Sequence, residues 1–108
     1  AFPFWLAPVQ VILLPISERH ISRVQELETN LNAAQFRTKS DLKNEKMGLK
    51  IRRAQLEKIP YMVVIGDKEA ENGMLSVRNR FEGDIGSMSY EQFLSLIQGL
   101  KTTRAVKP

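Results

Sequence analysis

Lysine and arginine side chains concentrate in one stretch of the chain, from Arg37 to Lys58. This stretch holds eight basic residues against three acidic ones, so its local excess of five positive charges is larger than the net charge of +4 of the whole chain. The remainder of the chain is therefore slightly acidic. If the fold displays these basic side chains as one contiguous patch, the patch would suit a polyanion such as a nucleic acid.

Other residue types near this stretch could read a base rather than a phosphate. Lysine and arginine suit phosphates, which set affinity but not sequence. Asn44 carries a donor and an acceptor on one planar amide, and the carboxylate of Glu69 could accept from N1–H and N2–H of one guanine. Reading of this kind favours unpaired bases in RNA loops. We expect the candidate residues to meet at one end of a sheet: Lys43, Asn44, Lys46, Lys50, Arg52, Glu69, Arg78 and Arg80.

The sequence offers little for catalysis. It contains no cysteine and a single histidine, so a thiolate nucleophile is absent and a catalytic zinc site is improbable. Its six glycines match neither of the glycine-rich phosphate-binding patterns, GxGxxG and GxxxxGK(S/T). A length of 108 residues fits one domain, and no apolar run approaches the ~20 residues of a membrane helix. The chain begins at Ala1 without a methionine, and we expect it to be a piece of a longer protein.

The apolar pattern predicts an α/β arrangement for the first half of the chain. Val9–Leu14 is a nearly continuous apolar run, typical of a strand covered on both faces. A helix is expected over Glu18–Ala34, with Ser17 as its N-cap and His20 facing solvent in its first turn. A short strand over Phe36–Ser40 completes a βαβ unit.

The loop Asp41–Lys46 then leaves the carboxyl end of that strand, where ligands bind in open α/β sheets, and a helix is expected over Lys46–Lys58. Ser89 and Gln92 form a capping box before the last helix. The other expected elements are a third apolar strand, a charged loop, a strand with one wet face, a short edge strand and a third helix: Ile59–Gly66, Asp67–Gly73, Met74–Arg80, Ile85–Met88 and Tyr90–Leu100.

Three segments carry a resemblance to a known family. DLKNEKMGLKIRRAQ (Asp41–Gln55), followed by IPYMVVIGDKE (Ile59–Glu69) and SVRNR (Ser76–Arg80), resembles the anticodon-binding domain of threonyl-tRNA synthetases. The opening FPFWLAPVQV (Phe2–Val11) resembles the point where that domain leaves the catalytic domain. A related domain serves prolyl, histidyl and glycyl synthetases, but the pairing of NEKxGxKI with GDKE is similar to the threonyl form. The match covers roughly Phe2–Leu100.

The resemblance implies a three-layer α/β/α fold with a mixed five-stranded sheet and three helices. It divides the chain into a linker from the catalytic domain (1–8), the anticodon-binding domain (9–100) and a basic tail (101–108). It implies reading of the second and third anticodon bases, G and U, of tRNA(Thr), with base contacts from Asn44, Glu69 and Arg78. Supporting or phosphate contacts would come from Lys43, Lys46, Lys50, Arg52 and Arg80.

The family charges tRNA with threonine in the cytoplasm, using ATP and a catalytic zinc that belong to a domain outside this chain. The resemblance therefore implies neither a catalytic nor a metal-binding residue here, and no cofactor of the domain itself. The parent enzyme is expected to be a homodimer, with no membrane or DNA partner. Lys58 stands where some relatives carry arginine, and a lysine lacks arginine's planar fork. Two alternatives stay open: a protein-interaction or dimerisation module with the same fold, and an enzyme complete in itself.

Overall fold

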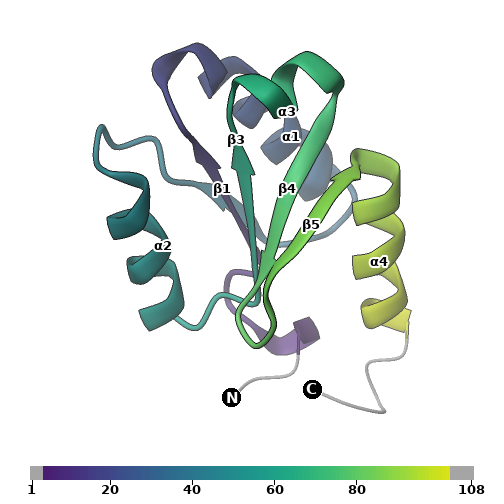
Figure 1. Ribbon diagram of the computed structural model, residues 1–108. Coiled ribbons are helices and arrows are strands. Elements are labelled where there is room, and N and C mark those ends of the chain that lie inside the picture. Colours follow the sequence, from purple (N-terminus) through teal and green to yellow (C-terminus); the bar gives the residue numbers. More distant parts are fainter. Residues whose placement is uncertain (1–3, 103–108) are drawn as a thin grey trace.

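The computed structural model describes residues 4–102 and is built on one mixed five-stranded sheet of order β2-β1-β3-β4-β5 (Figure 1). β1 pairs in parallel with β2 and β3, whereas β4 runs antiparallel to β3 and β5. The carboxyl ends of the three parallel strands therefore share one edge of the sheet, and β4 starts at that edge and ends at the opposite one. The strands are β1 Val11–Pro15, β2 Thr38–Ser40, β3 Tyr61–Ile65, β4 Met74–Asn79 and β5 Gly83–Ser89.

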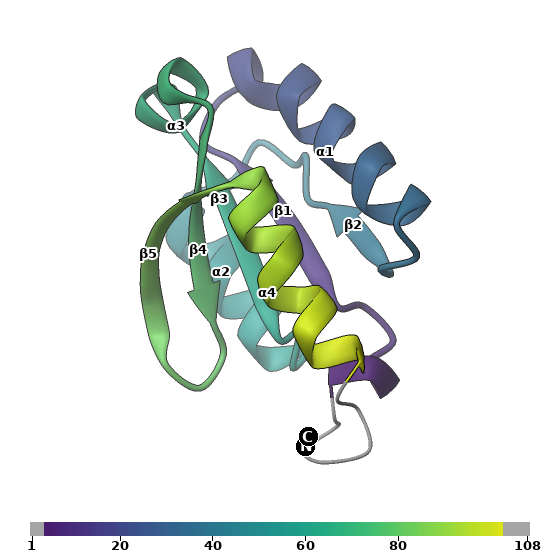
Figure 2. The same ribbon diagram turned by 90° about the vertical axis from the view of Figure 1, so that its right-hand side faces the viewer.

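Helices cover both faces of the sheet, which confirms the three-layer fold. α1 (Ile21–Ala33) and α4 (Tyr90–Thr102) lie on one face and α2 (Met47–Leu56) on the other (Figure 2). The expected helix from Glu18 starts with a 3-10 turn, η2 (Glu18–His20), before α1. The segment before β1 also forms a 3-10 turn, η1 (Phe4–Leu6). Residues 1–3 and 103–108, which include most of the expected tail, lie outside the described residues.

A fourth helix, α3 (Asp67–Asn72), forms where the sequence pattern predicted a charged loop. The helix is polar all round, so it lacks the apolar stripe that reveals a helix in a sequence. Its ends are nevertheless specified. The backbone N–H of Gly66 donates to Oε1 of Glu69 over 2.8 Å, and Gly73 adopts the left-handed conformation (φ 67°) that commonly ends a helix. The expected number of three helices is therefore wrong by this one short element.

The core lies on both faces of β1, every residue of which is buried. On one face Leu13 packs in a cluster with Leu27 of α1 and Phe93 of α4. On the other, Ile12 packs in a second cluster with Ala54 of α2. The nearly continuous apolar run therefore marks a strand covered on both sides, as predicted. α2 is the single helix on its face within the described residues, and it packs over β1 and β3, so the same face of β4 and β5 stays open (Figure 1).

Helix ends follow local rules of the sequence. The capping box at α4 is confirmed: the backbone N–H of Gln92 donates to Ser89 Oγ over 3.1 Å, and that of Ser89 donates to Gln92 Oε1 over 2.9 Å. α2 ends with Lys58 in the left-handed conformation (φ 60°), while the N–H of Ile59 reaches back to the carbonyl of Ala54. This is a Schellman ending without the usual glycine.

His20 is buried, with 5% of its surface exposed, and not solvent-facing as expected. Its Nε2 lies 2.8 Å from Oδ1 of Asp67, the first residue of α3. Arg19 donates to the other oxygen of the same carboxylate over 2.9 Å. Asp67 therefore joins the start of α3 to η2. Ser17 stands at the N-cap position of η2, but its side chain makes no capping hydrogen bond.

Candidate nucleic-acid interface

The carboxyl edge of the parallel strands carries a cavity of about 400 Å³. Its walls come from Pro15 at the end of β1, from η2 and the start of α1, and from the loop between β2 and α2. Three of the predicted site residues, Lys43, Asn44 and Lys50, line it. The side chains of Lys43 and Asn44 are exposed, so they could meet a ligand directly.

Lys50 lines this cavity, but its side chain is buried, whereas the sequence suggested a supporting or phosphate contact. Only 3% of its surface is exposed, and its Nζ donates to the backbone carbonyl of Asp41 over 3.1 Å. The ammonium has two further donors, but they can serve only a group that enters the cavity. Lys50 is therefore part of the wall that fixes the loop after β2.

Glu69 is half-buried at the same edge of the sheet. Its Oε1 accepts from the N–H of Gly66, and its other oxygen makes no hydrogen bond within residues 4–102. A Cβ on residue 66 would lie 3.0 Å from Oε1 of Glu69 and still closer to Ile16, so glycine is what lets this carboxylate sit against the backbone. The carboxylate is thus held in place through one oxygen, and the other can still accept.

Arg78 lies on β4, on the face that α2 partly covers. It pairs across the sheet with Met62, which packs against α2, whereas its neighbour Val77 points into the opposite cluster. The side chain is half-buried, and its Nε is buried without an acceptor among the described residues. An unsatisfied buried donor costs free energy. Arg78 also makes no ion pair within residues 4–102, so no acidic side chain of the described chain neutralises its guanidinium.

Arg80 lies away from the cavity, which corrects the expectation that all eight residues meet at one end of the sheet. Its Nη1 donates to the carbonyl of Lys58, beyond the end of α2, over 3.2 Å. The reason is the direction of β4: an antiparallel strand that starts beside α3 carries its last residues to the opposite edge (Figure 1). Arg78, next to the last residue of β4, pairs with Met62 near the start of β3, so it lies closer to Arg80 than to the cavity edge.

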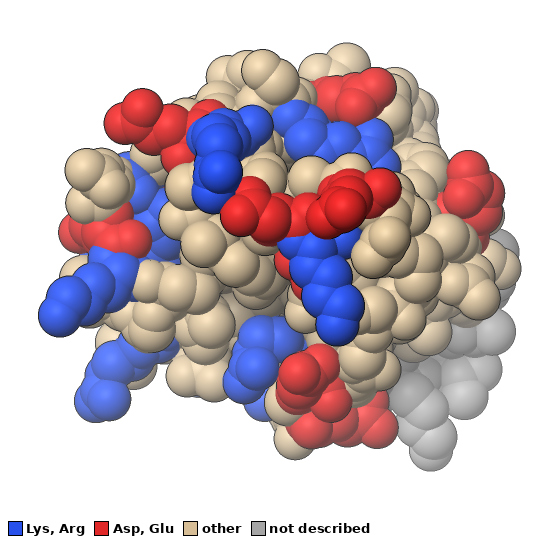
Figure 3. Space-filling model, turned by 45° about the horizontal axis from the view of Figure 1, so that its top comes forward, with Lys and Arg blue, Asp and Glu red and all other residues tan. Residues whose placement is uncertain are grey.

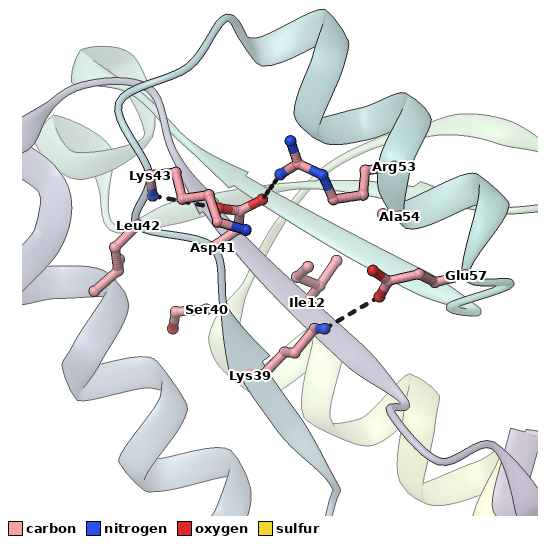
Figure 4. Close-up of a pocket in the computed structure, with 9 residues that line it drawn as sticks. All are labelled: Ile12, Lys39, Ser40, Asp41, Leu42, Lys43, Arg53, Ala54 and Glu57. Carbon is pink, nitrogen blue, oxygen red and sulfur yellow. Dashed lines mark hydrogen bonds and ion pairs between the residues drawn. The ribbon is translucent and has the colours of Figure 1, made fainter.

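The basic stretch does not form one patch, because α2 divides it. Figure 4 shows the side of α2 that faces β2, where a cavity of about 420 Å³ lies. There Lys39 pairs with Glu57 over 3.1 Å, and Arg53 pairs with Asp41 over 3.0 Å. Arg53 also pairs with Glu45, and this hydrogen bond raises the pKa of its guanidinium. These charges neutralise one another, and Figure 3 accordingly shows basic and acidic side chains interleaved on the upper surface.

Three of the predicted phosphate contacts remain exposed and make no ion pair within residues 4–102: Lys43, Lys46 and Arg52. Successive residues of a helix are turned by about 100°. Arg52 is therefore rotated away from Arg53 and from the β2 side of α2, toward solvent and the open part of the sheet.

Sequence reasoning missed the wall of the cavity that η2 and α1 supply, including Glu18 and Ser22. The available signal was Pro15, which ends β1 at the edge where the ligand site was expected. Within the described residues, no cluster of three or more His, Cys, Asp or Glu side chains could hold a metal ion. The described helices are all too short or too polar to cross a membrane.

Comparison with known proteins gives a consistent result. A family model described as "Anticodon binding domain" matches residues 10–100. The threonine–tRNA ligase of Clostridium acetobutylicum is 52% identical over 94 residues, which are 87% of this chain and 15% of that protein. The ligase of Acetivibrio thermocellus is 54% identical over 97 residues, 90% of this chain and 15% of that protein. The chain thus spans about 15% of the length of these curated relatives.

A solved structure agrees in fold. The RNA-binding domain of threonyl-tRNA synthetase from Cryptosporidium parvum Iowa II superposes with a TM-score of 0.87 and 30% sequence identity. The match covers 92% of this chain and 25% of that chain. With the family model matched over most of its length and these relatives in agreement, the chain belongs to the anticodon-binding domain family, in the form found in threonyl-tRNA synthetases.

Proposed function

We propose that this chain binds the anticodon stem-loop of tRNA(Thr) and reads its second and third anticodon bases, G and U. The observation that supports this most is the state of Arg78 and Glu69. One is a guanidinium whose Nε has no acceptor among the described residues, and the other is a carboxylate held through one oxygen only. Arg78 lies on β4, and Glu69 lies on α3, the helix that precedes this strand and packs against it.

The chemistry of guanine fits this pair. Arginine donates in a fork to O6 and N7 of guanine, and a carboxylate accepts from N1–H and N2–H on its other edge. Adenine offers neither pattern, so the two contacts together discriminate between the purines. Asn44, with one donor and one acceptor on the amide, suits the adjoining uracil from the exposed loop before α2.

The exposed cations would hold the backbone of the loop. Lys43, Lys46 and Arg52 neutralise phosphates without reading sequence, and Lys50 closes the cavity behind them. In this arrangement the parent protein supplies the rest of the activity: it charges the selected tRNA with threonine, using ATP and a zinc ion held outside this chain. The proposal extends to a homodimeric parent enzyme in the cytoplasm.

A binding series tests the proposal. Stem-loops that differ only in their second and third anticodon bases are titrated against the chain by fluorescence anisotropy, at several salt concentrations. We expect each wrong base to weaken binding by about 5- to 150-fold, which corresponds to about 1–3 kcal/mol. Every loop should also lose affinity with salt, with a slope of about −0.7 per neutralised phosphate. Equal affinity for all loops would reject base reading.

One observation favours a second function, a protein-interaction or dimerisation module. Leu49 and Leu56 are seven residues apart on α2, hence on the same side, and are 49% and 74% exposed. Apolar docking through this face would respond little to salt. A chain that self-associates in sedimentation experiments, with no RNA binding at low salt, would support this function instead.

A further inference from the structure

Phe81 is the one aromatic residue among the large apolar side chains that are exposed in the described part of the chain, with 71% of its surface accessible. It lies in the turn between β4 and β5, at the bottom of Figure 1. The position is three residues beyond Arg78, at the end of β4 that is remote from α3. No motif in the sequence had singled out this residue.

The ring is held in a fixed position despite its exposure. The guanidinium carbon of Arg80 lies 4.6 Å from the ring centroid, and Arg80 is itself tied to the carbonyl of Lys58. The side chain of Asn79 accepts from the backbone N–H of Phe81 over 2.8 Å and from that of Glu82 over 3.2 Å. A ligand that contacts this ring would therefore immobilise few protein groups that are not already held in place. The entropic cost of binding is then small, which favours binding.

The ring stands between two charged residues of the turn, Arg80 and Glu82. It also borders a small cavity lined by Phe4, Pro60, Tyr61 and Leu100. Surfaces that bind single-stranded nucleic acid combine arginines with exposed aromatic rings on which bases stack. Arg78 lies near the end of β4, and Arg80, one residue beyond the strand, places its guanidinium over the ring. The ring thus lies at the end of β4 that carries these two arginines.

We propose that Phe81 is a stacking platform for an unpaired base of the RNA, with Arg80 covering one face of the ring and the base covering the other. This proposal rests on the proposed function, because it concerns the same RNA. The platform adds a stacking contact whose strength does not depend on which base is present, because every base has a π face. The platform would position the loop while Glu69 and Arg78 read it.

The test compares Phe81→Ala, Phe81→Leu and Phe81→Trp in the full 108-residue chain. Each is titrated with matched stem-loops that carry a single 2-aminopurine at successive loop positions. We expect alanine and leucine to weaken binding by about 5- to 150-fold and tryptophan to preserve it. We also expect one 2-aminopurine position to be quenched on binding by the wild type and Phe81→Trp only. Thermal unfolding of each variant serves as the folding control.

The outcomes separate this proposal from the proposed function. If the wild type discriminates between loops but Phe81→Ala and Phe81→Leu bind as tightly as it does, the platform is refuted and the base reading stands. The same holds if leucine replaces phenylalanine without loss, because that indicates apolar contact and not stacking. If the wild type binds no loop, both proposals fail. If Phe81→Ala changes only self-association of the chain, the ring is a protein contact.

Discussion

Glu69 offers the sharpest test, because it has two separable roles. One oxygen of its carboxylate accepts from the Gly66 N–H at the start of α3, and we propose that the other accepts from guanine. Glu69→Gln keeps an oxygen for the Gly66 N–H but replaces the second acceptor with an NH₂ donor. Glu69→Ala removes both. The two variants should therefore differ in stability and agree in their loss of base discrimination.

The magnitudes follow from the geometry. Loss of a hydrogen bond at a helix N-terminus costs about 1 kcal/mol, which lowers the melting temperature of a domain of this size by about 4–8 °C. We expect that loss for Glu69→Ala and only a small change for Glu69→Gln. In binding, both variants should lose about 1–3 kcal/mol of preference for guanine at the second anticodon position. Glutamine places a donor toward the N1–H of guanine, so it should not restore the preference.

Urea unfolding gives the stability, and fluorescence anisotropy with stem-loops carrying guanine or adenine at the second position gives the preference. The ratio of the two affinities is the decisive quantity, because a general loss of folded protein cancels from it. If Glu69→Gln keeps the wild-type ratio, the carboxylate does not read guanine. If Glu69→Ala unfolds at the wild-type urea concentration, its contact with Gly66 contributes nothing to α3.

Four further outcomes are expected. Arg78→Lys should lose about 1–3 kcal/mol of base discrimination while its salt slope stays unchanged, because the charge remains and the fork is lost; a lower slope with intact discrimination, measured by anisotropy, would contradict this. Arg52→Ala should weaken all loops alike and reduce the salt slope by about 0.7; a change confined to one loop sequence would argue for base contact. Lys58→Gly should raise stability by about 1 kcal/mol in urea unfolding, because it relieves a left-handed backbone conformation; a lower melting temperature would refute that reason. Burial raises the pKa of Tyr61 above its ordinary value of 10.0, so the unfolded chain ionises first and stability should fall as the pH rises beyond about 10. Tyr61→Phe should lose less stability than the wild type over that range, and parallel curves would show that the phenol does not contribute.

Much of the fold could be predicted from apolar spacing. The continuous run that became β1 and the stripe of Val24, Leu27 and Leu31 on α1 each record which side of an element is buried. The antiparallel direction of β4 also followed from its alternation, because a strand with one wet face is typical of antiparallel pairing. α3 escaped prediction because its six residues include no apolar stripe, and its capping hydrogen bond involves the backbone of a glycine.

The sequence singled out candidate residues of the site but gave their arrangement only in part. Asn44 lines the cavity at the carboxyl edge of the parallel strands, Glu69 lies on α3 at the same edge, and Arg78 lies on β4 toward the opposite edge. Whether they contact RNA stays a prediction. Charge counting could not show that Lys50 is buried, nor that Arg53 is paired with Asp41 and Glu45 of the loop before α2. Such pairings depend on how α2 is rotated against the sheet, which composition does not encode.

The contacts of Asp67 with Arg19 and His20 give α3 a support that its own length cannot. An isolated helix of six residues is too short to be stable in water. In this structure, however, the carboxylate of Asp67 contacts Arg19 and the buried His20, which belong to η2 directly before α1. Glu69, which we propose reads guanine, is thereby held in place through Asp67, two residues away on the same helix. Inherited changes at Asp67 or His20 could therefore blunt tRNA selection without altering a single contact to the nucleic acid.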